Sequence, residues 1–229
     1  MTERQIAVVV GAGPGLGNAL VHRFAHAGMT VAAVSRSGGH VASTPEPDRK
    51  RVRGFTCDAT QSAEVTATFA KIESELGVPD LVVFNVGTWD RRSILELSEE
   101  ILIQAWRIGC LAGFLVGQTA ARTMLPRRKG TIIFTGATGS IRGGSGFAAF
   151  AVPKFGLRAL AQSMARKLGP KGLHVAHVIV DGMIAAEGDS GSPSSLAPTA
   201  IADVYYDLHR QDRTAWSHEL DLRPMTESF

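Results

Sequence analysis

Four glycines lie within seven residues near the start of the chain, at Gly11, Gly13, Gly15 and Gly17. They follow an apolar, β-branched run over residues 6–10, and apolar residues then recur at helical spacing. A strand that turns tightly into a helix leaves the first N–H groups of the helix unpaired, beside the positive end of the helix dipole. Because glycine has no Cβ, a pyrophosphate can come close to those groups. The alternative is an ordinary glycine-rich turn.

The elements around this turn alternate between strands and helices. Apolar runs predict strands over residues 5–10, 30–35, 52–56, 80–85, 130–135 and 173–180, with a short final strand within 216–224. Helical spacing fills the gaps, at residues 15–27, 61–76, 98–124, 147–168 and 198–211. This alternation predicts an α/β fold, a single doubly wound parallel sheet with helices on both faces. Ligands bind such sheets at the carboxyl ends of the strands, so we expect the chemistry in the loops that follow them.

The length of 229 residues, with no linker, predicts one domain over 1–229. Residues 185–197 are rich in Gly, Ser and Pro, and we interpret them as a mobile lid over the substrate pocket. A disordered surface loop is the alternative. Residues 198–229 are expected to form a helix and an edge strand.

Composition argues against several classes of function. The net charge is only +3, and the basic clusters at 49–53 and 127–129 have no interleaved aromatics, so we expect no nucleic acid. Cys57 and Cys110 make neither a disulfide framework nor a metal spacing, and the histidines are scattered, which predicts no metal and a cytoplasmic location. No uninterrupted apolar run is long enough for a membrane span, and the first residues lead straight into a strand, so we expect neither a membrane helix nor a signal peptide.

The glycine spacing is G-x-x-x-G-x-G, since the last position of G-x-G-x-x-G falls on Leu16 or Asn18. This pattern resembles the short-chain dehydrogenase/reductase family, and the resemblance runs from Ile6 to about Pro224. It implies a Rossmann-like fold and a nicotinamide dinucleotide cofactor. The cofactor contacts it implies are Gly11, Gly13, Gly15, Leu16, Gly17, Ser35, Arg36, Asp58, Asn85, Gly87, Lys154, Gly182 and Ile184.

The end of the second strand reads Ser35-Arg36 and has no acidic residue to bind a ribose 2′-OH. A guanidinium suits a 2′-phosphate by charge and by bidentate geometry. We therefore predict NADP(H), with NAD(H) the less favoured cofactor. A surface arginine is the alternative interpretation of Arg36.

Two later strand ends match the family as well. Asp58 resembles the aspartate that contacts the adenine, although it is also a candidate helix N-cap. Asn85-Val86-Gly87 corresponds to Asn-Ala-Gly, which supports the sheet and the cofactor ribose.

The catalytic positions of the family are mostly substituted. The signature Tyr-x-x-x-Lys reads Phe150 and Lys154, and a tyrosine seven residues before the lysine would fall on Phe147. The serine position falls on Ala137, and the helix asparagine falls on Cys110, which we interpret as a small buried apolar residue. A phenyl ring carries no proton, so reduction of an ordinary ketone by the family mechanism is not expected.

Other groups near these positions could handle the proton. Thr135 ends the predicted fifth strand and Thr138 and Ser140 follow it, although their spacing argues against a simple exchange with the family serine. Asp181 precedes Gly182 where the family has Pro-Gly. A water or a group of the substrate is the further alternative for the proton. An Asp-Gly pair is also a common turn, which is the alternative for Asp181. We take Lys154, Phe150, Ala137, Thr138 and Asp181 as the candidate catalytic positions.

Two functions follow from this pattern. The first is an NADP(H)-dependent oxidoreductase that transfers hydride to or from a small carbonyl, alcohol or related substrate with a non-standard active site. The second is a non-catalytic NADP(H)-binding protein, such as a redox sensor or partner subunit. The resemblance also implies a homo-dimer or homo-tetramer, paired through the helices near 98–124 and 147–168.

Overall fold

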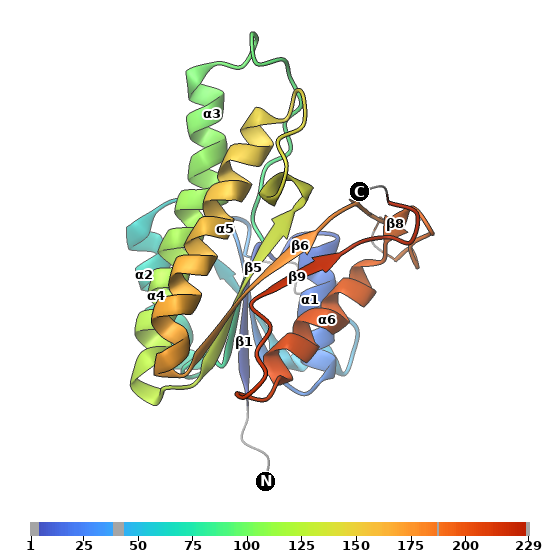
Figure 1. Cartoon of the computed structure of the whole chain (residues 1–229). Helices are drawn as coiled ribbons and strands as arrows, with labels where there is room; N and C mark the ends of the chain where they lie inside the picture. The colour runs from blue at the N-terminus through green and yellow to red at the C-terminus, as the bar shows by residue number, and fades with distance from the viewer. Residues whose placement is uncertain (1–4, 39–43, 187, 228–229) are drawn as a thin grey trace.

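The computed structural model describes residues 5–38, 44–186 and 188–227. Of the domain predicted over 1–229, residues 1–4, 39–43, 187 and 228–229 lie outside the described residues. Within the described ranges the chain forms one large sheet with helices packed on both of its faces, and a small two-stranded sheet of β7 (Met183–Ile184) and β8 (Ser195–Leu196) (Figure 1). The predicted α/β class is confirmed.

Seven parallel strands form the sheet in the order β3-β2-β1-β4-β5-β6-β9. The strands are β1 Ile6–Val10, β2 Thr30–Ser35, β3 Val52–Thr56, β4 Leu81–Phe84, β5 Gly130–Ala137, β6 Leu173–Val180 and β9 Glu219–Leu222. The strand order reverses direction between β1 and β4, so the carboxyl ends of these two strands flank the crevice where doubly wound sheets bind ligands.

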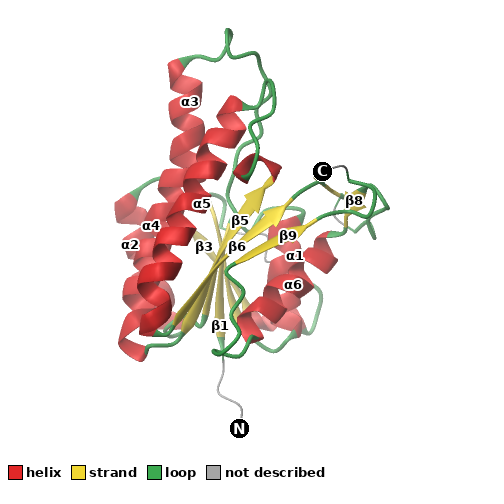
Figure 2. Ribbon diagram, viewed as in Figure 1, coloured by secondary structure: helices red, strands yellow, loops and turns green. Residues whose placement is uncertain are grey.

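The helices lie in two layers (Figure 2). The main helices are α1 Leu16–His26, α2 Ser62–Glu75, α3 Glu99–Trp106, α4 Ala112–Met124, α5 Ala148–Leu168 and α6 Pro198–Arg210. Helices α2, α4 and α5 cover one face of the sheet, and α1 and α6 cover the other. Figure 1 shows α3 and the start of α5 extending beyond the carboxyl edge of the sheet.

Strand β1 shows why the two layers form. Its side chains alternate between the faces, with Val8 and Val10 in the core under α2 and α4, and Ala7 and Val9 in the core under α1. All five residues of β1 are buried, as a central parallel strand requires.

The predicted continuous helix over 98–124 is wrong in detail. A π-helical segment, Arg107–Leu111, interrupts it between α3 and α4. The interruption lies where α5 crosses closely, because Gly109 lies against Pro153 and Gly156 lies against the Cys110 thiol. The helix begins as predicted after Ser98, whose hydroxyl accepts a hydrogen bond from the Ile101 N–H.

The helical stretch Glu99–Arg127 is long and apolar enough to cross a membrane by length and composition, although only 39% of its most apolar window is buried. Core helices of other proteins pass the same test. Here Ala112, Val116, Ala120 and Met124 face the sheet. The expectation of no membrane partner stays a prediction.

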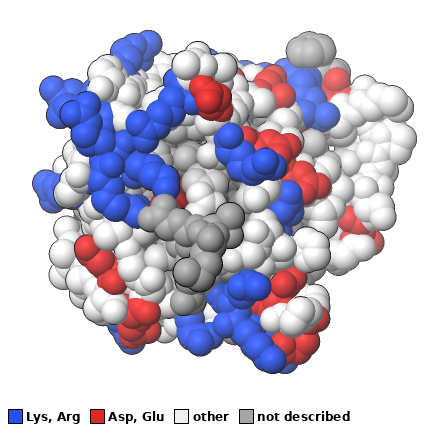
Figure 3. Space-filling model, turned by 90° about the horizontal axis from the view of Figure 1, so that it is seen from below, with Lys and Arg blue, Asp and Glu red and all other residues white. Residues whose placement is uncertain are grey.

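The amino edge of the sheet carries much of the positive charge. Seen from below, Lys and Arg side chains gather on one side of this face (Figure 3). At this edge Asp80 is buried and lies 3.5 Å from Arg127 and 3.9 Å from Lys129, so part of the predicted basic cluster is paired within the fold.

Candidate active site

The glycine-rich turn joins β1 to α1 and is shaped by close backbone contacts. Gly11 has a φ of +96°, and a Cβ there would lie 2.5 Å from the Asn85 carbonyl oxygen. A Cβ on Gly17 would collide with the Gly11 carbonyl oxygen. These two positions therefore require glycine for packing, and Leu16 between them is buried in the core.

Gly13 and Gly15 differ from these two because a Cβ at either position would meet open space. Gly15 is the N-cap of α1, with a φ of +83° and no side-chain hydrogen bond to the helix. The first N–H groups of α1 thus have no side-chain cap, which is the arrangement that binds a phosphate.

A cavity of about 180 Å³ lies at the ends of β2, β3 and β4, and Arg36, Asp58 and Gly87 line it. The Asp58 carboxylate accepts hydrogen bonds from the Thr60 N–H at 2.9 Å and from the Thr60 hydroxyl at 2.8 Å. These bonds, with a smaller contribution from Arg36, hold the pKa of Asp58 below its ordinary value. The N-cap of α2 is Gln61, so the N-cap alternative for Asp58 is wrong.

The end of β2 also places Ser35 at this edge. Its hydroxyl lies 3.4 Å from that of Ser37, and Arg36 beside it is exposed. The structure therefore places Ser35, Arg36 and Asp58 at the same edge of the sheet, with Arg36 and Asp58 lining one cavity.

Lys154 lies between this cavity and the rest of the site. Its side chain is buried, and Nζ donates a hydrogen bond to the Thr135 carbonyl at 2.7 Å. A Cβ on Gly87 would lie 3.4 Å from Nζ, so the ammonium reaches the end of β4. Burial lowers the pKa of Lys154 to about 8. Asn85 fixes the neighbouring backbone, because its amide donates to the Gly11 carbonyl at 3.3 Å.

A second cavity, of about 300 Å³, lies at the carboxyl ends of β5 and β6. We call it the aromatic cavity. Its lining residues are Trp89, Ala137, Thr138, Gly139, Arg142, Gly144, Phe147, Phe150, Val180, Gly182, Met183 and Glu227. The Trp89 ring lies 5.1 Å from the Phe150 ring and 5.3 Å from the Phe147 ring, centroid to centroid. Two of the substituted catalytic positions, Ala137 and Phe150, therefore share one small, largely apolar site.

The structure separates three hydroxyls at the carboxyl end of β5, those of Thr135 within the strand and of Thr138 and Ser140 after it. Thr138 lines the aromatic cavity and donates its hydroxyl to the Asp181 carboxylate. Thr135 is buried and accepts a hydrogen bond from Tyr205 at 2.9 Å. Ser140 is buried and its hydroxyl accepts from the Ala137 N–H at 3.1 Å, so of the three only Thr138 is placed to meet a substrate.

Asp181 lies behind Thr138 and is fully buried. Its carboxylate is paired with Arg223 at 2.7 Å and with Arg142 at 3.5 Å. The turn interpretation also holds, since Gly182 has a φ of +147° and lies against Pro224. Asp181 itself does not line the cavity, so any proton exchange with a ligand would pass through Thr138.

The two ends of the segment after Asp181 are held together by a short pair of strands. Strand β7, Met183–Ile184, pairs with β8, Ser195–Leu196. Between them, Gly188, Asp189 and Ser190 line a hollow beside α1 that also includes Gly15. Ile184, in β7, is 36% exposed. The lid over 185–197 stays a prediction.

Cys110 lies in the π-helical segment and packs its thiol on Gly156 of α5. Burial raises the pKa of this thiol, so it is protonated near neutral pH. This contact supports the interpretation of Cys110 as a packing residue.

Sequence reasoning missed several residues that line the aromatic cavity, among them Trp89, Arg142 and Glu227. These three come from the loop after β4, the loop after β5 and the C-terminal tail. The only available signal was that the first two lie in loops after strands, where ligands bind.

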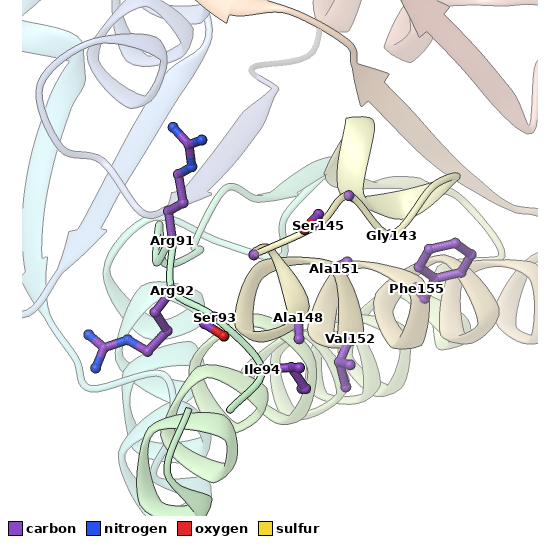
Figure 4. A pocket seen from close by; sticks show the side chains of 12 residues that line it. Arg91, Arg92, Ser93, Ile94, Gly143, Ser145, Ala148, Ala151, Val152 and Phe155 are labelled. Atoms are coloured by element: carbon purple, nitrogen blue, oxygen red, sulfur yellow. The ribbon is translucent and has the colours of Figure 1, made fainter. Parts of the chain in front are cut away.

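A larger hollow, of about 950 Å³, lies on the far side of residues 143–146 (Figure 4). The loop residues Arg91–Ile94 and the helix residues Val152 and Phe155 line it. Its helix side is apolar and is continuous with the outer surface of α5.

No group of three or more His, Cys, Asp or Glu side chains that could hold a metal occurs in residues 5–38, 44–186 and 188–227. The arrangement fits a dinucleotide instead. An uncapped helix end beside Gly13 and Gly15 suits the pyrophosphate, and Arg36 and Asp58 suit the adenosine end. Lys154 Nζ lies against Gly87, which lines the cavity of about 180 Å³, and Phe150, one helical turn earlier, lines the aromatic cavity.

Comparison with known proteins agrees with this geometry. A family model described as short chain dehydrogenase matches residues 5–192. The chain is 30% identical over 180 residues to the 3-oxoacyl-[acyl-carrier-protein] reductase MabA of Mycobacterium avium, which covers 79% of this chain and 67% of that protein. It is 26% identical over 204 residues to (21S)-21-acetoxyl-apo-melianone synthase SDR of Melia azedarach, over 88% of this chain and 75% of that one.

Solved structures are similar over nearly the whole chain. A short-chain dehydrogenase from Rhodopseudomonas palustris is 39% identical with a TM-score of 0.85, covering 96% of this chain and 98% of that one. A variant of actinorhodin polyketide ketoreductase with NADPH has a TM-score of 0.86 at 19% identity, over 99% and 98% of the two chains, a likeness that shows the fold. The chain therefore belongs to the short-chain dehydrogenase family of oxidoreductases.

Proposed function

We propose that the chain is an NADP(H)-dependent oxidoreductase that transfers hydride to or from a small carbonyl or alcohol compound held in the aromatic cavity. The observation that carries this proposal is the position of Lys154. Its Nζ donates a hydrogen bond to the Thr135 carbonyl and lies against Gly87, which lines the cavity of about 180 Å³ together with Arg36. Phe150, one helical turn away from Lys154, lines the aromatic cavity. A dinucleotide that joins the two cavities would be held at this lysine.

The cofactor residues divide by the part of the dinucleotide that each would bind. Arg36 and Ser35 would bind the 2′-phosphate, and Asp58 the adenine. The turn at Gly13 and Gly15 would bind the pyrophosphate. The preference for NADP(H) rests on Arg36 and the missing acid at the end of β2, and related folds have been solved with NADPH and NADP.

At the other end, Lys154 and Asn85 would hold the nicotinamide ribose, and Gly182 and Ile184 would border the nicotinamide. When bound, the cofactor supplies or accepts the hydride.

Thr138 and Asp181 are the groups we propose for the proton. Because the Thr138 hydroxyl donates to Asp181, its oxygen has a free lone pair for a substrate hydroxyl. A proton from the substrate alcohol can then move to Thr138 as the Thr138 proton moves to Asp181. The reverse transfer serves carbonyl reduction.

The test is turnover with a stereochemically labelled cofactor. Deuterated NADPH, protein and a panel of neutral aldehydes, ketones and activated alkenes are expected to give product that carries deuterium. Lys154→Met should lower both cofactor affinity and deuterium transfer. Failure of NADPH to bind well-folded protein in calorimetry would contradict the proposal.

A non-catalytic NADP(H)-binding protein is the second candidate. The observation that favours it is the replacement of all three proton-handling side chains of the family, at Cys110, Ala137 and Phe150. Tight NADPH binding with no deuterium transfer to any panel member would support this function.

We also propose that the protein is a homo-dimer or homo-tetramer. Large apolar side chains on α3, α4 and α5 are between 39% and 47% exposed: Ile103, Trp106, Phe114, Val152 and Phe155. Burying this face against a second copy would remove it from water. Sedimentation that gives only monomer at micromolar concentration would contradict this assembly.

A cytoplasmic location remains a separate prediction.

A further inference from the structure

Arg142 brings a cation to the wall of the aromatic cavity. It follows the short helical turn Thr138–Ser140 after β5 and is one of two ionisable residues among those that line the cavity. Its side chain is 43% exposed, so it is open to a ligand as well as to Asp181.

The contact with Asp181 leaves hydrogen-bond donors of the Arg142 guanidinium available to a ligand. The carboxylate has a 2.7 Å contact with Arg223, whose side chain is only 13% exposed, and it accepts the Thr138 hydroxyl. The contact with Arg142 is longer, at 3.5 Å, and involves one of its two terminal nitrogens. Two guanidiniums share one buried carboxylate, which leaves Arg142 with N–H groups for another acceptor.

The second ionisable lining residue, Glu227, has the opposite charge. Its carboxylate lies near Gly182, where a glycine Cβ would be 3.5 Å from it. Within the described ranges, no ion pair of 4 Å or less joins Glu227 to Arg142. The negative charge of Glu227 therefore repels an anionic ligand in the same cavity and reduces the net attraction that Arg142 exerts on it.

The rest of the cavity lining is largely apolar and rich in aromatic rings. Trp89, Phe147 and Phe150 form a cluster of three rings, and Val180 and Met183 add aliphatic surface. The volume of about 300 Å³ lies at the lower end of the range for small-molecule sites, roughly 300–1,000 Å³.

We propose that the aromatic cavity takes a planar carbonyl or alcohol compound that also bears a carboxylate, and that Arg142 binds this carboxylate. The inference rests on the proposed function for the role of the carbonyl, but the anion subsite is a separate claim about Arg142. A guanidinium and a carboxylate can form two parallel charge-assisted hydrogen bonds.

The test compares two ligands of the same shape on NADP⁺-saturated protein, 4-formylbenzoate and 4-formylbenzamide, with binding measured by calorimetry. The oxidised cofactor has no hydride to transfer to either aldehyde, so the heat reports binding. The wild-type protein should bind the acid more tightly by roughly 10- to 150-fold. Arg142→Gln should abolish that preference, and Glu227→Gln should increase it. Arg92→Gln is the control, because Arg92 is held by Asp90 and lines the other hollow, and it should keep the wild-type preference.

Equal affinities for acid and amide in the wild-type protein would overturn the inference, as would a preference that survives in Arg142→Gln. If Arg142→Gln does not fold, the wild-type ratio and the increase in Glu227→Gln decide alone. NADPH binding and turnover of the neutral amide without an acid preference would refute only the subsite. An acid preference that depends on Arg142, without deuterium transfer, would refute only the proposed oxidoreductase activity.

Discussion

Replacing Phe150 by tyrosine should speed carbonyl reduction in the aromatic cavity. Side chains four residues apart on a helix have Cβ atoms about 5–6 Å apart, so the new phenol would lie one turn from Lys154. The lysine is buried and fixed at 2.7 Å on the Thr135 carbonyl. A cation at about 6 Å stabilises a phenolate by about 3 kcal/mol at an effective dielectric constant of about 20, which lowers the phenol pKa toward neutrality.

The expected gain follows from the general acid that this restores. A positioned proton donor is worth ~10²–10⁴-fold in rate, or about 3–5 kcal/mol of transition-state stabilisation. The cavity wall does not have to change, because Phe150 already packs edge-on to Trp89 with the rings 5.1 Å apart. NADPH affinity should therefore stay the same while the rate rises.

The assay is single-turnover oxidation of bound NADPH by a neutral aromatic aldehyde, followed by absorbance. Phe155→Tyr is the matched control. It adds the same hydroxyl to the same helix, but Phe155 lines the larger hollow of about 950 Å³ and not the aromatic cavity. A rate for Phe150→Tyr within about threefold of wild type, with intact NADPH binding and fold, would refute the assigned geometry of Phe150 and Lys154, because ~10²-fold or more is expected.

Three further predictions concern charge and pH. Arg36→Asp should lower the ratio of NADPH to NADH affinity by roughly 10- to 150-fold, measured by calorimetry with both cofactors; an unchanged ratio would refute the 2′-phosphate assignment. Since burial lowers the pKa of Lys154 to about 8, its charge is lost as pH rises through 8, and NADPH affinity should fall between pH 7 and 9 in wild type but much less in Lys154→Met. Burial lowers the pKa of His177 to about 4, so the unfolded chain takes up its proton first as pH falls. Urea unfolding should show stability that is full above about pH 6.5 and declines toward pH 4 by up to ~1.4 kcal/mol per pH unit for this group, with a shallower slope in His177→Gln.

The fold could be predicted because its signals are local. Buried parallel strands appear as short apolar runs, and β1 shows this clearly with five buried residues. The π-helical segment at Arg107–Leu111 could not be predicted, since it depends on how closely α5 approaches at Gly109 and Gly156.

The places of the candidate cofactor residues could be predicted because they lie at strand ends. Gly17 packs against the Gly11 carbonyl within one turn, and Arg36 directly follows the end of its strand. The contact of Gly11 with the Asn85 backbone could not be predicted, because it joins two segments that are far apart in the sequence. The substrate half depends on tertiary structure. Glu227 reaches the aromatic cavity only because β9 returns the C-terminal tail to the edge of β6.

The directions in which side chains point also could not be predicted from the sequence. Thr135, Thr138 and Ser140 are equivalent by type and position, but only Thr138 lines the aromatic cavity. The burial of Thr135 under Tyr205 and the bond from Ser140 to the Ala137 backbone depend on packing between segments.

The central claim is that the turn after β1 binds the cofactor pyrophosphate, and NADPH calorimetry on two alanine variants tests it most directly. Gly15 and Gly28 have φ values of +83° and +89°, and a Cβ at either meets no atom within 4 Å. Each alanine should therefore cost about 1–2 kcal/mol of stability from backbone strain alone. We predict that Gly15→Ala loses NADPH affinity by at least about tenfold because its Cβ intrudes on the phosphate. Gly28→Ala, at the other end of α1, should bind as wild type does. Equal NADPH affinity in the two variants would contradict the claim.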